Sequence, residues 1–323
     1  MERKLYESCE AQASRNHTGA YQSDLKGKTM DQDHSTDEIR QAAAGIAESY
    51  NEYDVPMYGS LLRLPERNAV IDILHDLQKL LFPAYFGDPY LTRLPPQQYS
   101  ALLLEHIQKK LCKQISLALE ETPENITATR EICAAIIRKI PDIQRFLAKD
   151  LTATFEGDPA AKSKMEVLFS YPGFFAIFVY RVAHELYLRH VPLIPRMMTE
   201  YAHSKTGIDI HPGAVIGEHF FIDHGTGIVI GETTIIGSHV RIYQGATLGA
   251  LSPKSGQARS DTKRHPTVGN NVTIYSGATI LGGETVIGDN VTIGGNVFLT
   301  DSVPANTRVS IKAPELKFRE VEF

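Results

Sequence analysis

The sequence predicts a multidomain α+β chain in which an N-terminal all-α helical domain precedes a solenoid of short parallel strands. Three observations support this prediction. Apolar residues recur at helical spacing up to about residue 206, aliphatic residues then recur every six positions, and 17 of the 24 glycines lie between Gly207 and Gly295. Helices need few glycines, whereas tight backbone corners need many. The two parts of the chain therefore follow different structural rules.

Composition and charge exclude several classes of protein. The 323 residues carry a net charge of −5, which argues against a nucleic-acid partner. The longest apolar run, residues 174–180, is far shorter than the roughly 20 residues that a membrane helix needs. The three cysteines form no CxxC pair, and the N-terminus lacks the apolar stretch of a signal peptide. We therefore expect a cytoplasmic protein with no membrane partner.

The N-terminal part contains a polar arm and then helices. Residues 1–36 are polar and predict a flexible arm, and residues 37–206 predict the helical domain. Over residues 68–82 the apolar side chains fall on one helical face. Further stretches with helical spacing are 101–119, 128–140, 142–155, 172–190 and 195–204.

From residue 207 to residue 302 the aliphatic period is six. Such a period fits neither a helix nor a hairpin meander, but it fits a solenoid whose strands turn a corner every six residues. We expect these residues to point inward: Ile210, Ile216, Ile222, Ile230, Ile236, Ile242, Leu248, Val268, Ile274, Ile280, Ile287, Ile293 and Leu299. The pattern resembles the hexapeptide-repeat family, which implies a left-handed parallel β-helix, usually trimeric. Residues 303–323 are predicted to be a C-terminal tail.

The repeat loses register at three places. Ile222 and Ile230 are eight residues apart, and the insertion contains DHGTG (223–227). Leu248 and Val268 are twenty apart, which predicts an extruded polar loop over residues 249–266. A one-residue bulge follows Ile280. Long loops on a rigid scaffold are where function usually lies.

Several polar residues at or near these breaks can carry chemistry. His224 lies in the first break beside Asp223, and Arg264 and His265 end the long loop. A histidine held by a carboxylate such as Asp209 can act as a general base toward an alcohol. The alternative is that these are polar corner residues with local hydrogen bonds. The number of such residues in one region favours a catalytic site over corner residues with only local hydrogen bonds.

The motifs in this region resemble those of the serine O-acetyltransferase family. They are DIHPGAVIG and DHGTGIVIGE within residues 209–232, QGATLG (244–249), RHP (264–266) and ATILGG (278–283), with DPAAKSK (158–164) and YRVAHELY (180–187) in the helical part. The resemblance covers about residues 150–305. It implies transfer of acetyl from acetyl-CoA to the hydroxyl of L-serine, giving O-acetyl-L-serine and CoA in cysteine biosynthesis.

The resemblance also implies residue roles. His224 would take the proton of the serine hydroxyl, Asp209 would orient its imidazole, and His265 would lie beside the reacting centre. The charged groups of the substrate would be bound by residues of opposite charge: Asp158 and Asp223 for the ammonium group, and Arg264 for the carboxylate. A planar two-pronged cation suits a carboxylate.

Acetyl-CoA is the expected cosubstrate, and no metal is expected. The family binds coenzyme A in a groove between two prisms of the trimer, along small residues. The matching positions are Ala250, Ser276, Gly277 and Gly295, with Ser276 in place of the usual alanine. Corner packing is the alternative explanation for all four.

Two departures from the family pattern concern the loop and the partners. The loop 249–266 is about six residues longer than usual. The family's tail often ends in an isoleucine that enters the active site of cysteine synthase, whereas this chain ends in Phe323, which argues against that complex. The expected assembly is a homotrimer or, through the N-terminal helices, a dimer of trimers.

Three other functions remain open on the sequence alone. An acetyl-CoA-dependent O-acetyltransferase could use another hydroxyl acceptor, such as homoserine or a sugar, although a sugar has no need for the charged set around Asp158. A zinc enzyme of the γ-carbonic anhydrase type shares the prism, and His219 and His224 form an HxxxxH, but no third ligand is evident. A non-catalytic scaffold is the third alternative.

Overall fold

The computed structural model describes residues 34–50, 52–53, 58, 63–119, 122–251, 262–312 and 319. The chain divides into two compact units, residues 1–62 and 63–323. In the first unit the structure describes the helix α2 (His34–Ser49), which begins inside the predicted arm 1–36. The rest of that arm, residues 252–261 of the predicted loop 249–266, and Phe323 lie outside the described residues.

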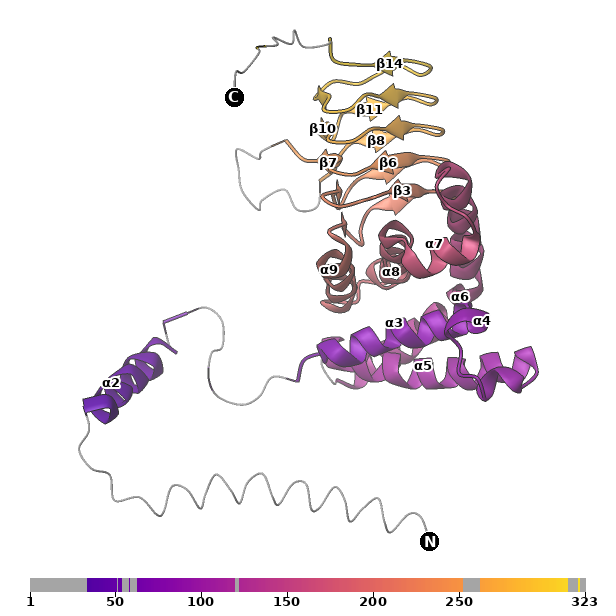
Figure 1. The fold of residues 1–323 in the computed structure, drawn as a ribbon. Helices are drawn as coiled ribbons and strands as arrows, with labels where there is room; N and C mark the ends of the chain where they lie inside the picture. The colour runs from indigo at the N-terminus through magenta and orange to yellow at the C-terminus, as the bar shows by residue number, and fades with distance from the viewer. Residues whose placement is uncertain are drawn as a thin grey trace. The chain divides into compact units, whose positions relative to one another are not determined.

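The second unit begins with helices, most of which bury one apolar face. They are α3 (Arg67–Leu81), α4 (Pro83–Phe86), the 3₁₀ helix η1 (Leu91–Arg93), α5 (Pro96–Leu119), α6 (Pro123–Gly157), α7 (Lys164–Ser170), α8 (Pro172–Tyr187) and α9 (Ile194–Thr206). Helix α3 packs against α5, α5 against α6, and α8 against α9 (Figure 1). Among the described helices, none is long and apolar enough by itself to span a membrane, and only the bent pair α7–α8 meets that test, on length and composition.

Helix α6 joins two predicted stretches, 128–140 and 142–155, although Pro141 lies between them. A proline inside a helix removes a backbone donor and crowds the preceding turn, at a cost of about 3 kcal/mol. Burial of an aliphatic side chain contributes about 1.5–3 kcal/mol, and α6 buries four on both sides of the proline: Ile136, Ile140, Ile143 and Leu147. Apolar burial therefore outweighs the proline.

Short strands then form the solenoid. They are β1 (Asp209–Ile210), β2 (Val215–Ile216), β3 (Phe221–Asp223), β4 (Val229–Ile230), β5 (Ile235–Ile236), β6 (Arg241–Tyr243), β7 (Thr247–Gly249), β8 (Thr267–Val268), β9 (Thr273–Ile274), β10 (Thr279–Leu281), β11 (Val286–Ile287), β12 (Thr292–Ile293), β13 (Phe298–Leu299) and β14 (Arg308–Val309). The solenoid stacks on the helices α6, α8 and α9 (Figure 1).

All strand pairs are parallel and form three sheets. The first sheet has the order β1-β4-β7-β10-β13, the second β2-β5-β8-β11, and the third β3-β6-β9-β12-β14. Strands β4 and β7 pair Val229 with Thr247, eighteen positions or three repeats apart, whereas β1 pairs Asp209 with Val229, twenty positions apart. The two extra positions are the predicted insertion around DHGTG. Because β14 pairs with β12, the solenoid extends into the segment 303–323 predicted as a tail.

The predicted aliphatic residues fill the solenoid interior. Twelve of the thirteen are at most 5% exposed. Leu299 also packs against the core, but it is only partly buried. Its strand, β13, is the last of the first sheet, so no further strand of that sheet covers it.

Thr234 is a polar side chain in this interior. It lies two residues before Ile236, at a level where other coils place Ile228 or Val240, and its Oγ1 is buried without a hydrogen-bond partner among the described residues. We predict that Thr234→Val raises the free energy of unfolding by about 1 kcal/mol, because it removes an unpaired hydroxyl without changing the shape. Thermal melts at a fixed protein concentration test this, and a melting temperature below that of the wild type would contradict it.

A buried ion pair connects the helices to the first coils of the solenoid. Arg181 of α8 donates to both carboxylate oxygens of Asp150 of α6, at 2.7 and 3.0 Å. Its guanidinium also donates to the carbonyl oxygens of Ile216 and Gly217, at 3.0 and 2.7 Å. Asp150 accepts the backbone N–H of Phe220 at 2.9 Å. These contacts fix the solenoid on α6 and α8, and therefore fix the position of β3 beside the end of α6.

Candidate functional site

His224 lies at the corner that follows β3, in the left-handed backbone region with a φ of 55°. Its side chain is 71% exposed, and its Nδ1 lies 3.6 Å from the Oδ1 of Asp223, whose side chain is only 14% exposed. The corner thus points an accessible imidazole outward beside a carboxylate. This is the arrangement expected of a general base that works on a bound molecule.

Asp158 reaches the same corner from the turn after α6. Its Oδ2 accepts the Tyr171 hydroxyl at 2.6 Å, and its Oδ1 accepts the Ala160 N–H at 2.8 Å. The Tyr171 hydrogen bond, then the Ala160 N–H, hold the pKa of Asp158 below its usual range, and the positive charge of a protonated His224 adds to this. The same hydrogen bond raises the pKa of Tyr171 to about 12. We call Asp158, Tyr171, Asp223 and His224 the first cluster.

A second cluster consists of Asp209, Glu232, Arg264 and His265. Arg264 donates to the Glu232 carboxylate, which also accepts the Tyr187 hydroxyl at 2.8 Å. Burial alone would raise the pKa of Glu232, but the hydrogen bonds from Tyr187 and Arg264 outweigh it, and the pKa is lowered. The partner of Asp209 is Arg196 of α9, at 3.4 Å. A guanidinium and a carboxylate thus lie together at this cluster.

His265 is the buried member of the second cluster, with 8% exposure. Its Nδ1 faces the Thr233 backbone N–H at 3.1 Å and the Thr233 hydroxyl at 2.9 Å. Burial, and then the charge of Arg264, lower the pKa of His265 to about 4. Its imidazole is therefore neutral at physiological pH.

The two clusters lie at different edges of the solenoid. His224 follows β3, at the edge where the third sheet leads into the first, whereas Glu232, Arg264 and His265 lie between the first and second sheets. No hydrogen bond or ion pair between described residues joins Asp209 to His224. The predicted orienting contact is therefore not made within one chain, where Asp209 begins β1 of the first sheet and His224 lies at the corner after β3.

The residues predicted to bind coenzyme A divide in the same way. Ala250 follows β7, at the edge of the second cluster. Ser276, Gly277 and Gly295 follow β9 and β12, at the edge of the first cluster. There a Cβ on Gly295 would lie only 3.2 Å from the Ser276 carbonyl oxygen, so this corner has little room for a larger residue.

Sequence reasoning assigned no role to Tyr171, Glu232 or Thr233. Tyr171 precedes Pro172 at the start of α8 and contacts Asp158 from thirteen residues away. Glu232 and Thr233 follow β4, and both contact Arg264. The sequence did contain a signal for Glu232 and Thr233. Glu232 ends the GIVIGE motif, which follows the first register break, and Thr233 comes directly after it.

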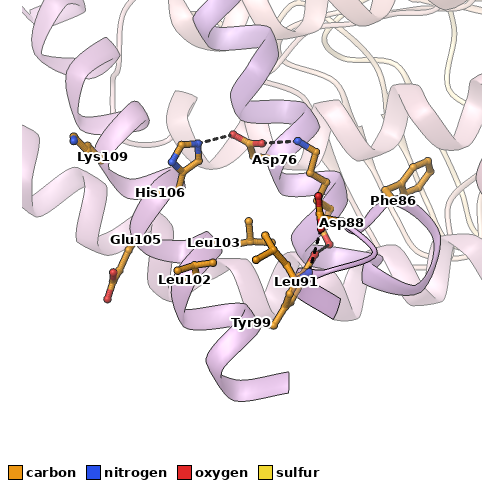
Figure 2. Close-up of a pocket in the computed structure, with 11 residues that line it drawn as sticks. Asp76, Phe86, Asp88, Leu91, Tyr99, Leu102, Leu103, Glu105, His106 and Lys109 are labelled. Carbon is orange, nitrogen blue, oxygen red and sulfur yellow. Dashed lines mark hydrogen bonds and ion pairs between the residues drawn. The ribbon is translucent and has the colours of Figure 1, made fainter. Parts of the chain in front are cut away.

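Among the described residues, neither the cavity of about 670 Å³ nor the group with metal-ligand spacing brings the predicted site residues together. A cavity of about 670 Å³ lies between α3, η1 and α5, where Asp76 is held by Lys79 and His106, and it contains none of them (Figure 2). Among the described residues, the group with metal-ligand spacing is Glu200, His203 and Asp209, and it includes neither His219 nor His224. Arg196 already pairs with both carboxylates of that group.

Comparisons with known proteins agree on one family. Residues 88–178 match the family model described as serine acetyltransferase, N-terminal. The chain is 46% identical over 227 residues to a plasmid-borne serine acetyltransferase of Synechococcus elongatus, covering 66% of this chain and 71% of that one. Two other curated serine acetyltransferases match over 50% and 49% of their own length, so the chain spans about half of each.

Solved structures of serine acetyltransferases are also similar to this chain. Serine acetyltransferase 1 of Entamoeba histolytica, in complex with L-cysteine, superposes with a TM-score of 0.67 at 40% identity, over 74% of this chain and 86% of that one. The Neisseria gonorrhoeae serine acetyltransferase in complex with serine gives 0.51 at 28% identity, over 76% and 97%. The predicted fold class is confirmed: helices are followed by a left-handed parallel β-helix.

Proposed function

Since the chain belongs to the serine acetyltransferase family, we propose that it transfers the acetyl group of acetyl-CoA to the hydroxyl of L-serine. The observation that carries this proposal is the pair of charged clusters. One presents carboxylates beside an exposed imidazole, and the other presents a guanidinium. An amino acid carries an ammonium group, a carboxylate and, in serine, a hydroxyl, and the two clusters offer a partner for each.

The residue roles follow from charge and position. Asp158 and Asp223 of the first cluster bind the ammonium group, and the ionised state of Asp158 is favoured by its hydrogen bonds. Arg264 of the second cluster binds the carboxylate, either beside Glu232 or in exchange for it. The serine hydroxyl then lies at His224, whose imidazole is accessible.

The transfer is a direct displacement. As the serine oxygen forms its bond to the thioester carbonyl carbon, His224 accepts the hydroxyl proton. Collapse of the tetrahedral intermediate breaks the carbon–sulfur bond, and His224 returns the proton to the CoA sulfur. The products are O-acetyl-L-serine and CoA. Acetyl-CoA lies along the small residues Ser276, Gly277 and Gly295 of one edge and Ala250 of the other.

The complete site requires two copies of the chain. Within one chain the clusters lie at opposite edges of the first sheet, and this placement supports a ligand that contacts both clusters where two prisms meet. In a ring with threefold symmetry the first-cluster edge of each copy faces the second-cluster edge of its neighbour. This trimer also lets Asp209 of one copy approach His224 of the next. No metal has a part in this mechanism.

An acceptor panel tests the proposal. Purified protein is given acetyl-CoA with L-serine, L-homoserine or a galactoside, and CoA release is followed by thiol titration. We expect the highest kcat/KM with L-serine, because one extra methylene moves the homoserine hydroxyl relative to His224, and a galactoside has no charged groups for the clusters. CoA release at background level with L-serine would reject the assignment, and a preference for homoserine would favour the other acceptor.

Tyr171 provides a test of the ammonium site. We predict that Tyr171→Phe raises the KM for L-serine by roughly 3- to 10-fold at pH 7.5, because Asp158 loses a charge-assisted hydrogen bond. The lost donor also raises the pKa of Asp158 toward its ordinary value. Tyr90→Phe, at an exposed tyrosine beside η1, is the control. An unchanged KM in Tyr171→Phe would show that Asp158 does not contribute to serine binding.

A further inference from the structure

Thr233 makes four hydrogen bonds to the segment that ends the long loop. Its Oγ1 accepts the backbone N–H groups of Arg264 and His265, at 2.9 and 3.0 Å. Its hydroxyl and its backbone N–H both face the Nδ1 of His265, at 2.9 and 3.1 Å. Thr233 therefore holds both the backbone and the imidazole ring of His265, the buried member of the second cluster.

These contacts determine which ring nitrogen of His265 carries the proton. A hydroxyl oxygen that accepts two N–H groups has its own hydrogen left to donate, and here the third partner is Nδ1. Since the Thr233 backbone N–H also donates to Nδ1, that nitrogen is an acceptor and carries no hydrogen. The proton of the neutral ring is therefore on Nε2.

Gly231 leaves room for the Nε2 edge of this ring. A Cβ at residue 231 would lie 2.1 Å from Nε2 and 2.0 Å from Cδ2 of His265. A side chain there would occupy the place of the ring. His265 is therefore constrained on both sides. Thr233 donates to Nδ1, and Gly231 has no side chain that would clash with Nε2.

We propose that Thr233 is a positioning residue that fixes His265 as a neutral Nε2–H donor, aimed at the oxygen that gains negative charge during acetyl transfer. This proposal rests on the proposed function. Preorganised donors at a developing oxyanion are among the largest contributions to acyl transfer. His265 is then a donor and His224 the base, so the two histidines have separate roles. The charged groups facing His265 are Arg264, Lys263 and Glu232, with His211 also near, and the cations oppose protonation.

Paired substitutions at His265 test whether it donates. His265→Gln keeps an amide N–H near the position of Nε2 and cannot serve as a base, whereas His265→Leu has no donor. We expect His265→Leu to lower kcat by about 10²- to 10³-fold and His265→Gln to retain at least about tenfold more activity than His265→Leu. Equal loss in both variants would overturn the donor role.

Substitutions at Thr233 test the positioning. Thr233→Val should lower kcat by about 10- to 100-fold with an unchanged KM for acetyl-CoA, and Thr233→Ser should restore most of it because the hydroxyl returns. Thr234→Val is the matched control, since the neighbouring hydroxyl has no partner among the described residues. Full activity in Thr233→Val would overturn the proposal.

A readout that does not depend on activity separates this proposal from the proposed function. Deuterium exchange at the imidazole C2 position, followed by mass spectrometry, reports protonation of each histidine. In the wild type His265 should not titrate between pH 5.5 and 8, and in Thr233→Val its pKa should rise because a donor against Nδ1 is lost. Titration of wild-type His265 in this range would contradict the proposal, whereas an inactive wild type with the expected exchange profile would contradict the function alone.

Discussion

His224→Asn is expected to lower kcat for L-serine acetylation by about 10²- to 10⁴-fold, which is the usual contribution of a general base. Asparagine is the informative replacement because residue 224 has a φ of 55°, and asparagine tolerates this backbone region better than alanine. Other corners of the solenoid, such as Asn271 and Asn290, already place asparagine there. The variant should therefore fold normally, and CoA release at saturating substrates measures the loss.

His239→Asn is the matched control for this variant. His239 occupies another left-handed corner, with a φ of 60°, and its ring stacks on His219 away from both clusters. The same chemical change at the same backbone conformation should leave kcat within about twofold of the wild type. If His224→Asn also stays that close to the wild type, His224 is not the base.

Arg181→Leu is expected to lower the free energy of unfolding by about 3–5 kcal/mol, since it leaves the Asp150 carboxylate buried without its cation. The Arg181 and Asp150 side chains are 7% and 0% exposed, and the carbonyl oxygens of Ile216 and Gly217 lose their donors as well. A fall in melting temperature of about 10 °C at a fixed protein concentration would be the corresponding signal. The loss should appear in both the helices and the solenoid, because the pair joins them.

Two further variants isolate the ion pair. Arg145→Leu removes an exposed arginine of α6 that pairs with Asp142, and should change stability by no more than about 1 kcal/mol. Asp150→Asn combined with Arg181→Leu removes both charges and should cost less than the sum of the two single changes. Additive losses would show that the two side chains act independently and would contradict the account of this junction.

The solenoid could be predicted from spacing alone, because a six-residue period with glycine at the corners has one simple structural solution. Leu299 is less buried than the other twelve residues because its strand ends a sheet, and spacing does not show where stacking ends. Pro141 suggested a break in α6 that apolar burial prevents. In both places the three-dimensional neighbours, rather than the local sequence, determined the result.

The site was predictable in part. His224 and Arg264 stood out because they lie where the repeat loses register. Tyr171 and Thr233 did not, because their importance lies in hydroxyl contacts to Asp158 and His265, made across thirteen and thirty-two positions of sequence. Motifs also do not show that the predicted residues divide between two edges, because a motif lists residues without saying at which edge each of them lies.

The central claim is that the two clusters act on one serine from neighbouring copies, and subunit mixing tests it most directly. His224→Asn lacks the base of the first cluster, and Arg264→Ala lacks the cation of the second. The two variants are coexpressed so that their chains mix. Each trimer that contains both variants then has one interface at which an intact first cluster faces an intact second cluster. An equal mixture should therefore recover roughly one quarter of the wild-type kcat per chain with L-serine, although each variant alone is nearly inactive. Activity no higher than the mean of the two pure variants would contradict a shared site.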